Sequence, residues 1–266
     1  NTIPKTGGLV YCCIITDKFQ ALHFREITEN QRDRVRASKY VQSKMGDIFR
    51  ICKKDLIDGR KVLFSGTPCQ VAGLKNFLNR EYDNLVCVDI LCHGVPSPAV
   101  WEKYVQWQEK KANDKIVKVD FRNKVDFGWR AHYETLWFSK GKKVDSRVYT
   151  NLFYKHSILR PCCYKCPFKS TDRVGDISIA DYWGVEKAAP KFDDNKGVSL
   201  VLVNSDRGRK LFETAKGTIV WEETCLEDSM QNALKQSYQE PCDRKKFWTE
   251  FEMISGDWSS DVCSSD

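Results

Sequence analysis

The fold is decided by one stretch, Lys61-Val-Leu-Phe-Ser-Gly-Thr-Pro-Cys-Gln70. Its first half, Lys61 to Ser65, is a short apolar run typical of a buried strand. Gly66 follows as a turn residue, and the apolar spacing after it predicts a helix from Gln70 to Asn79. A strand that leads through a turn into a helix is the repeating unit of α/β folds, whose ligands collect at the carboxyl ends of parallel strands.

Strand-like and helix-like segments alternate on both sides of this stretch. Apolar runs predict further strands at Leu9 to Thr16, Leu85 to Leu91, Asp176 to Ala180 and Val198 to Val203. Helical spacing predicts helices at Lys44 to Asp58, from Pro98 to about Lys111, and from Asp206 to Ala215. We therefore expect an α/β fold with a mixed, partly parallel sheet flanked by helices.

The pattern changes in the middle of the chain. Three consecutive segments read as strands with no helix-like segment between them: Ile116 to Arg122, Tyr133 to Ser139 and Lys142 to Tyr149. Antiparallel strands need only short connections, whereas parallel strands need a long crossover. We therefore expect an antiparallel β insertion within the α/β domain.

The composition indicates a folded protein with a large core. The chain has 266 residues, 41% of them hydrophobic, and it contains eight Trp. It lacks the run of about 18 apolar residues that a membrane-spanning helix needs, so we expect no membrane span and a cytoplasmic location. The formal net charge of +7 includes no block of about five like charges. We therefore expect no nucleic-acid partner.

Both ends of the chain are atypical. Leu9 to Thr16 is already a buried strand and no initiator Met precedes it, so we expect the chain to begin inside a domain that lacks its N-terminal part. Residues 255–266 have neither a helical nor a strand period, and we expect a non-native tail there. The predicted domain therefore covers residues 1–254.

The cysteines point to metal chemistry. The chain has 12 of them, yet it is longer and richer in core residues than most disulfide-rich secreted domains. Cys163 and Cys166 form a CxxC motif followed by Pro167, a spacing that lets two thiolates from one tight turn reach the same metal or cluster. From spacing alone, an iron–sulfur cluster, a zinc ion and a redox dithiol fit this motif equally well.

Two more cysteines favour a four-thiolate site. Cys69 follows the strand that ends at Ser65, and Cys92 follows the next strand, so adjacent parallel strands would place both thiols at one sheet edge. A loop carrying Cys163 and Cys166 would complete the set. Taken alone, Cys69 also suits a buried thiol in a helix-cap turn, and Cys92 suits a small core residue. We expect His93 to be a hydrogen-bonding neighbour and not a ligand.

A series of motifs resembles the coenzyme F420 hydrogenase/dehydrogenase beta-subunit family. The motifs occur in the family's order over roughly residues 8 to 215: Ser38-Lys-Tyr-Val-Gln-Ser43, Leu63-Phe-Ser-Gly-Thr-Pro-Cys-Gln-Val-Ala-Gly-Leu74, Cys92-His-Gly94, Phe121-Arg-Asn-Lys124 with Gly128-Trp129, Cys163-Tyr-Lys-Cys-Pro-Phe-Lys169 and Asp176-Ile-Ser-Ile-Ala-Asp-Tyr-Trp-Gly184. Members are similar to flavoproteins that hold FAD beside a 4Fe-4S cluster. They relay electrons between a diffusible carrier and a partner or substrate.

The resemblance implies specific cofactor residues. It assigns the cluster thiolates to Cys69, Cys92, Cys163 and Cys166. It places the FAD site at Ser38, Lys39, Tyr40, Gln42, Ser43, Gly66 and Thr67. Without the resemblance, residues 38–43 read as an ordinary polar strand or loop. The carrier would be the reduced deazaflavin coenzyme F420 or ferredoxin, and the partner a redox protein or a ferredoxin-like domain.

Other interpretations of the same residues stay open. One alternative is a zinc-stabilised binding module without catalysis, and another is a reductase that serves envelope polysaccharide synthesis. Lys169 and Arg173 flank the cysteine loop and either tune a cluster by their charge or are solvated. Asp176 and Asp181 bracket a strand and either orient these cations or cap the strand. The sequence identifies no general acid or base.

Overall fold

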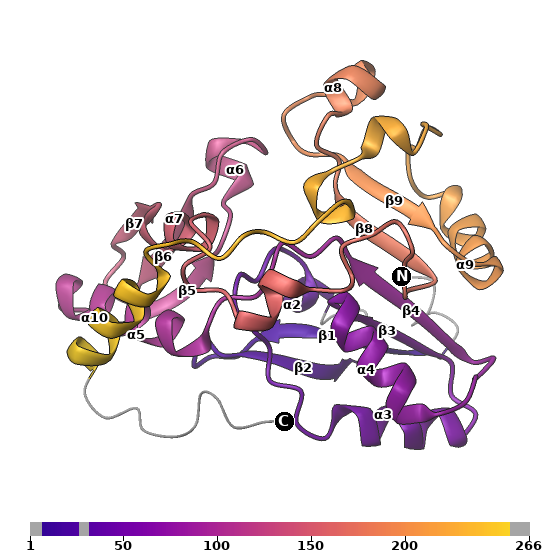
Figure 1. Ribbon diagram of the computed structural model, residues 1–266, viewed down its shortest axis with the longest axis horizontal. Helices are drawn as coiled ribbons and strands as arrows, with labels where there is room; N and C mark the ends of the chain where they lie inside the picture. Colours follow the sequence, from indigo (N-terminus) through magenta and orange to yellow (C-terminus); the bar gives the residue numbers. More distant parts are fainter. Residues whose placement is uncertain (1–6, 27–31, 256–266) are drawn as a thin grey trace.

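The computed structural model describes residues 7–26 and 32–255. The predicted non-native tail therefore lies outside the described residues, apart from Ser255, which ends the last helix. The chain folds around two sheets, one of six strands and one of three (Figure 1).

The six-stranded sheet is mixed, with a parallel centre and antiparallel edges. Its strands lie in the order β2 (Ala21–Glu26), β1 (Leu9–Ile15), β3 (Val62–Gly66), β4 (Leu85–Ile90), β8 (Ile177–Asp181) and β9 (Ser199–Val203). The pairs β1·β3, β3·β4 and β4·β8 are parallel, whereas β1·β2 and β8·β9 are antiparallel. This confirms the predicted α/β class and the partly parallel sheet.

Two helices cover one face of this sheet. These are α3 (Ile48–Ile57) and α4 (Pro68–Leu78), and they enclose a core that includes Tyr11, Phe64 and Leu74, none of which has solvent-accessible surface. A third helix, α9 (Asp206–Lys216), packs beside β9. The approach is close, because a Cβ on Gly208 would lie 2.0 Å from the carbonyl oxygen of Asp176.

The predicted antiparallel insertion is present as the three-stranded sheet. Its strands are β5 (Ile116–Asp120), β6 (Glu134–Phe138) and β7 (Lys143–Ser146), with both pairs antiparallel. The helices α5 (Pro98–Ala112), α6 (Lys124–Phe127) and α7 (Val148–Tyr154) lie with this sheet on one side of the molecule (Figure 1). Trp101, Leu136 and Tyr149 belong to a second core cluster in this half.

The structure corrects two sequence predictions and adds one strand. The strand predicted over Lys142 to Tyr149 ends at Ser146, and helix α7 begins at Val148. The helix predicted from Lys44 begins at Ile48. Strand β2 was not predicted at all.

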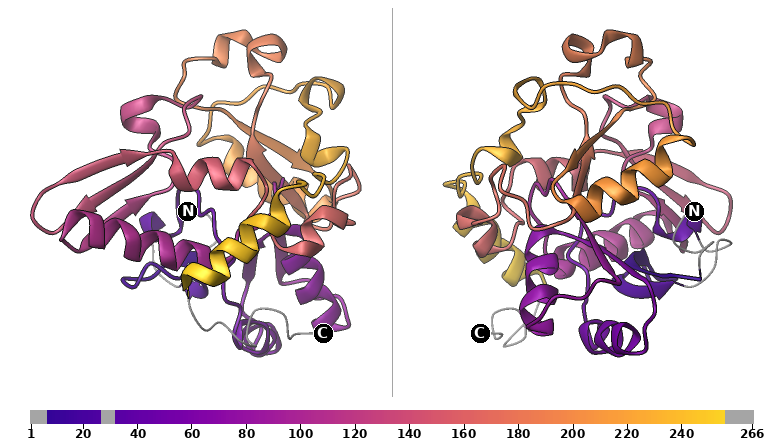
Figure 2. Two further views of the ribbon diagram at one scale, coloured as in Figure 1. Left: turned by 60° about the vertical axis from the view of Figure 1, so that its left-hand side comes forward. Right: turned by 90° about the vertical axis from the view of Figure 1, so that its right-hand side faces the viewer.

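The last part of the chain connects the two halves. After α9, it passes through η4 (Glu227–Ser229) and η5 (Asn232–Leu234) and reaches α10 (Arg244–Ser255) beside the smaller sheet (Figures 1 and 2). The other short helices are α2 (Arg32–Val35), η2 (Pro161–Lys165), α8 (Val185–Ala188) and η3 (Pro190–Phe192). Over residues 7–26 and 32–255, every helix is too short or too polar to cross a lipid bilayer.

Candidate functional site

The four predicted cysteines lie around the carboxyl edge of the parallel strands. Cys69 is in the first turn of α4, directly after β3, and Cys92 lies two residues beyond the end of β4. Because β3 and β4 are adjacent and parallel, both residues occupy the same sheet edge. Cys163 belongs to the short helix η2, and Cys166 follows its last residue.

The thiols are close enough to interact electrostatically. Burial is the main cause that raises the pKa of Cys92 to about 12; Lys169 acts against it, and the neighbouring Cys163 and Cys69 thiols contribute to it. Burial likewise raises the pKa of Cys163 to about 11, with contributions from Cys69 and Cys166. In the described part of the chain, however, no three His, Cys, Asp or Glu side chains converge closely enough to hold a single metal ion.

A buried cation lies among these thiols. Lys169 is 8% exposed, and its Nζ donates to the backbone carbonyl oxygens of Cys92 and of His93, the latter at 3.2 Å. Burial lowers the pKa of Lys169, while the thiols of Cys92, Cys166 and Cys163 act in the opposite direction. The ammonium group is therefore held beside the cysteines and not solvated.

Of the two roles left open for Asp176 and Asp181, orienting Lys169 and Arg173 is not the one observed. Arg173 instead forms a buried ion pair with Asp89 at the end of β4, with Nη2 and Oδ1 2.7 Å apart. The Asp176 carboxylate accepts the backbone N–H of Cys87 in β4 at 2.8 Å. The Asp181 carboxylate instead pairs with Arg122 and Lys124, which follow strand β5 of the smaller sheet.

Two of the predicted flavin residues, Thr67 and Ser43, form one hydrogen-bonded group with Cys69, and a third, Gly66, packs against this group. The Thr67 hydroxyl lies 3.1 Å from the Cys69 sulfur, and the Thr67 N–H donates to Oε1 of Gln70 at 3.0 Å. The other end of the Gln70 side chain donates to the Ser43 hydroxyl at 2.9 Å. Gly66 packs against Gln70 so closely that a Cβ would lie 3.0 Å from Oε1.

His23 completes this group and was missed by the sequence analysis. Its Nε2 donates to the carbonyl oxygen of Ser65 at 3.1 Å, and its Nδ1 lies 2.8 Å from the Ser43 hydroxyl. Burial lowers the pKa of His23, so the ring is neutral and Nδ1 accepts the Ser43 proton. His23 comes from the unpredicted strand β2, and its only sequence signal was a lone His in a short run.

The remaining flavin candidates lie nearer the smaller sheet. The Tyr40 ring stacks on Phe153 of α7 with ring centroids 4.7 Å apart. The Gln42 N–H donates to the carbonyl oxygen of Pro96 at 3.0 Å. Lys39 directs its Nζ back to three carbonyl oxygens of residues 35–37, and burial lowers its pKa. Ser38 is half-buried.

The rings of Tyr40, Phe153 and His93, here called the aromatic wall, form a row that leads from Tyr40 to the cysteines. Phe153, the stacking partner of Tyr40, lies with its ring centroid 4.6 Å from that of His93, which follows Cys92 directly. Nε2 of His93 is buried and has no hydrogen-bond partner among the described residues, and burial lowers the pKa of this ring to about 3. The His93 ring therefore makes aromatic contacts, and the hydrogen bond to this residue, from Lys169, reaches its backbone carbonyl oxygen.

Charged and aromatic side chains continue this wall toward β8. Arg122, which follows β5, is buried and forms an ion pair with Asp181 at the end of β8. Trp129 donates from Nε1 to Asp181 at 3.1 Å and stacks on Trp183 at 4.6 Å. Burial raises the pKa of Asp181, but Arg122 and Lys124 outweigh it and lower the pKa overall. These contacts fasten the two sheets together at the candidate site.

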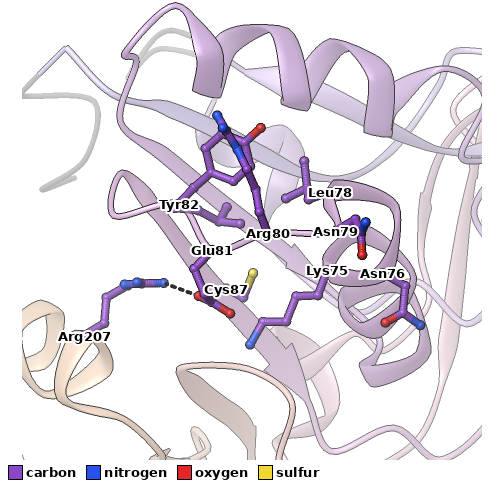
Figure 3. A pocket seen from close by; sticks show the side chains of 10 residues that line it. Lys75, Asn76, Leu78, Asn79, Arg80, Glu81, Tyr82, Cys87 and Arg207 are labelled. Atoms are coloured by element: carbon purple, nitrogen blue, oxygen red, sulfur yellow. Dashed lines mark ion pairs between the residues drawn. The ribbon is translucent and has the colours of Figure 1, made fainter.

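A cavity of about 530 Å³ lies at the opposite edge of the large sheet. Figure 3 shows the side chains that line it, at the end of α4, the start of β4 and the start of α9. Arg207 pairs with Glu81 at 3.9 Å, which Figure 3 marks by a dashed line. None of the predicted cofactor residues lines this cavity, so it is separate from the candidate site.

Comparison with known proteins identifies relatives of this chain. The profile of one family, described as the C terminus of the coenzyme F420 hydrogenase/dehydrogenase beta subunit, matches residues 59–229. Among solved structures, the chain is similar to one in the F420-reducing NiFe hydrogenase complex from Methanosarcina barkeri, with a TM-score of 0.56 and 15% sequence identity. The similarity covers 95% of this chain and 83% of that chain, and at this identity it shows a shared fold. No curated protein sequence matches the chain.

Proposed function

The chain belongs to the coenzyme F420 hydrogenase/dehydrogenase beta-subunit family, and on that basis we propose that it is an oxidoreductase subunit that transfers electrons. In this proposal, FAD and a 4Fe-4S cluster connect a diffusible carrier, reduced coenzyme F420 or ferredoxin, to a partner protein or substrate. A bound flavin exchanges electron pairs and a cluster exchanges single electrons. The observation that carries the proposal is the grouping of four thiols, a buried lysine and an aromatic wall at one sheet edge.

The donor set fits an iron–sulfur cluster. Iron–sulfur clusters are held by cysteine thiolates, and four are available here from three separate segments. Burial raises the pKa of Cys92 and Cys163, so iron binding would release their protons and would strengthen as the pH rises. Lys169 adds a positive charge beside the negatively charged thiolates and so stabilises the assembled site.

The flavin candidates divide into two groups with different roles. Thr67 offers a hydroxyl group beside Cys69 that would suit the polar edge of a flavin ring. The Ser43 hydroxyl is already bonded to Gln70 and His23 and would position Gln70 next to Thr67. Tyr40 offers part of an aromatic wall against which a planar ring system can pack. The three hydrogen-bond donors of the Lys39 ammonium group are already used by three carbonyl oxygens. Lys39 would therefore act on a flavin through its positive charge and not through a direct hydrogen bond.

The alternatives make different demands on the same cysteines. A structural zinc ion binds four thiolates at about 2.3 Å each, which requires all four sulfurs to converge on one point. A reductase for envelope polysaccharide synthesis would use the same two cofactors with another electron acceptor. A cytoplasmic location remains our expectation, since free thiols persist in reducing compartments.

The deciding experiment is an anaerobic absorption spectrum combined with iron, sulfide, zinc and flavin analysis. We expect broad visible absorption, iron and sulfide in equal amounts, and FAD that is released on denaturation. The double variant Cys163→Ser/Cys166→Ser should lose the iron. The matched control is Cys225→Ser/Cys242→Ser, which changes two exposed cysteines and should keep it. A colourless, zinc-containing protein that folds stably would refute the electron-transfer proposal.

A further inference from the structure

The segment of residues 231–240, here called the C-terminal strap, crosses the candidate cluster site. It follows η4, contains η5 and runs toward α10, from the side of β8 to the side of the smaller sheet (Figures 1 and 2). The strap begins after residue 229, where the family match ends. Its contacts with the site are therefore features of this chain beyond the matched region.

Ser237 holds the backbone of a predicted cluster ligand. Its hydroxyl accepts the N–H of Cys166 at 3.0 Å and donates to the carbonyl oxygen of the same residue at 3.2 Å. One side chain thus satisfies both backbone groups of Cys166. An N–H bonded in this way is withheld from any sulfur nearby, and N–H bonds to sulfur are one of the factors that set a cluster's reduction potential.

Tyr238 covers the residues beside Cys92. Its ring lies 4.1 Å from the ring of His93 and 4.2 Å from that of His156, measured between centroids. The Lys169 ammonium lies 5.2 Å from the same ring, within the range of a cation–π interaction. Tyr238 therefore contacts the two groups, His93 and Lys169, that border the Cys92 backbone.

The strap is fixed at both ends. At its start, Gln231 donates from Nε2 to the carbonyl oxygen of Asp181 at 2.7 Å. Beyond its end, Arg244 of α10 donates to the Tyr164 hydroxyl at 3.1 Å and to the Leu159 carbonyl oxygen at 3.3 Å. Trp248 adds a hydrogen bond to the carbonyl oxygen of Ser157 at 3.0 Å. These anchors hold Ser237 and Tyr238 against the cysteine loop.

We propose that the C-terminal strap is part of the cluster site, with Ser237 and Tyr238 as positioning residues. Ser237 fixes the Cys166 backbone so that its thiolate faces the other ligands, and Tyr238 keeps water and chelators from the Cys92 side. This inference rests on the proposed function, because it assigns a role toward the cluster. The contacts of Ser237 with Cys166 and of Tyr238 with His93 do not depend on that proposed function.

The first test compares Ser237→Ala with Ser237→Thr and with Gln239→Ala, which alters an exposed neighbour on the strap. In the iron-containing full chain, Ser237→Ala should lose iron to a chelator about tenfold faster, as is typical when a residue that orients a metal ligand is removed. Its reduction potential should rise, because the released Cys166 N–H can then bond to sulfur. Ser237→Thr keeps the hydroxyl and should restore both properties.

A second measurement does not require a cluster. In the full chain as purified without iron, Ser237→Ala should raise the rate at which iodoacetamide labels Cys166 by about fivefold, as expected for one lost hydrogen bond. Labelling of the exposed Cys162 serves as the internal reference. An iron-free wild-type protein would refute the proposed function, and the labelling rate would still decide whether the strap positions Cys166.

The proposed role of Tyr238 depends on the space that its ring fills and not on its hydroxyl group, so two variants that separate these features test it. Tyr238→Phe keeps the ring and should match the wild type in iron loss, whereas Tyr238→Ala should expose the Cys92 side and accelerate it. Unfolding midpoints of all variants establish that each is folded. The inference is overturned if Ser237→Ala matches Gln239→Ala in iron loss, reduction potential and Cys166 labelling.

Discussion

Ser43 connects three segments that are distant in sequence. Its buried hydroxyl accepts from Gln70 and donates to Nδ1 of His23. We expect Ser43→Ala to lower the free energy of unfolding by about 1–3 kcal/mol, because it leaves buried polar groups unpaired. Ser38→Ala is the control within the same motif and should change stability by less than about 0.5 kcal/mol. Urea denaturation without added FAD checks this, and equal effects of the two variants would contradict it.

The buried ion pair between Arg173 and Asp89 should contribute more to the free energy of unfolding than the Ser43 hydroxyl does. The side chains are 1% and 0% exposed, and Asp89 also accepts the Gly175 N–H at 2.9 Å. Arg173→Met strands a buried carboxylate and should cost roughly 3–5 kcal/mol. Arg50→Met removes a pair whose side chains are 78% and 75% exposed, and should cost less than about 1 kcal/mol. Similar urea midpoints for both variants would show that Asp89 finds another partner.

The candidate site was predictable only where local sequence carries its geometry. Cys163 and Cys166 share one turn, and Cys69 and Cys92 follow recognisable strands, so their spacing indicated a shared edge. His23 carried no such signal, since its contacts with Ser43 and with the Ser65 carbonyl depend on how β2 pairs with β1. Residues that act through distant partners become visible only in the folded chain.

At the scale of elements, β2 and α7 show why some segments escape prediction. In β2 the buried positions hold Ala21 and His23, while Phe24 on the other face is exposed, so the apolar alternation is inverted. Helix α7 consists largely of β-branched and aromatic residues that favour strands. It begins as a helix because buried Glu134 accepts the N–H groups of Tyr149 and Thr150 at 3.0 and 3.2 Å. Tertiary contacts therefore outweigh local propensity at both places.

Helix α9 provides a prediction in which packing opposes helix propensity. In an open helix, Gly to Ala gains about 1 kcal/mol. At Gly208 the new Cβ would lie 2.0 Å from the carbonyl oxygen of Asp176, so Gly208→Ala should cost about 1–3 kcal/mol by forcing the helix from the sheet. Gly217, at the end of the same helix, has no heavy atom within 4 Å of a built Cβ. Gly217→Ala should therefore be neutral or stabilise by up to about 1 kcal/mol. Thermal unfolding of both variants measures this, and a stabilising Gly208→Ala would contradict the close approach.

At the scale of the whole molecule, the site exists because two sheets meet. The carboxyl edge of the large sheet supplies Cys69, Cys92 and His93, while Phe153 of α7, beside the smaller sheet, and Tyr40 complete the aromatic wall. The Arg122–Asp181 ion pair and the C-terminal strap hold the two halves in contact. The α/β pattern of the sequence predicted each sheet, but no periodicity specifies the faces on which separate sheets join. That junction depends on buried charges and rings whose partners lie more than 50 residues away, such as Arg122 and Asp181.

The four histidines give the whole molecule a defined pH dependence. Burial lowers the pKa of all of them: His23, His93 to about 3, His132 to about 4, and His156. In the unfolded chain each would titrate near pH 6.5. Between that value and the folded pKa values, the unfolded state binds more protons, so stability is full above about pH 6.5 and falls as the pH decreases.

This dependence can be separated from carboxylate titration by its pH window. Between about pH 5 and pH 6.5 most carboxylates stay ionised, and each proton taken up on unfolding contributes about 1.4 kcal/mol per pH unit. We expect the free energy of unfolding, measured in urea, to decline across this window. His132→Gln removes one of the four groups and should make the decline shallower by up to one proton, because Gln does not titrate. A flat profile in the wild type, or an unchanged slope in His132→Gln, would mean that the histidines become protonated in the folded protein as readily as in the unfolded chain.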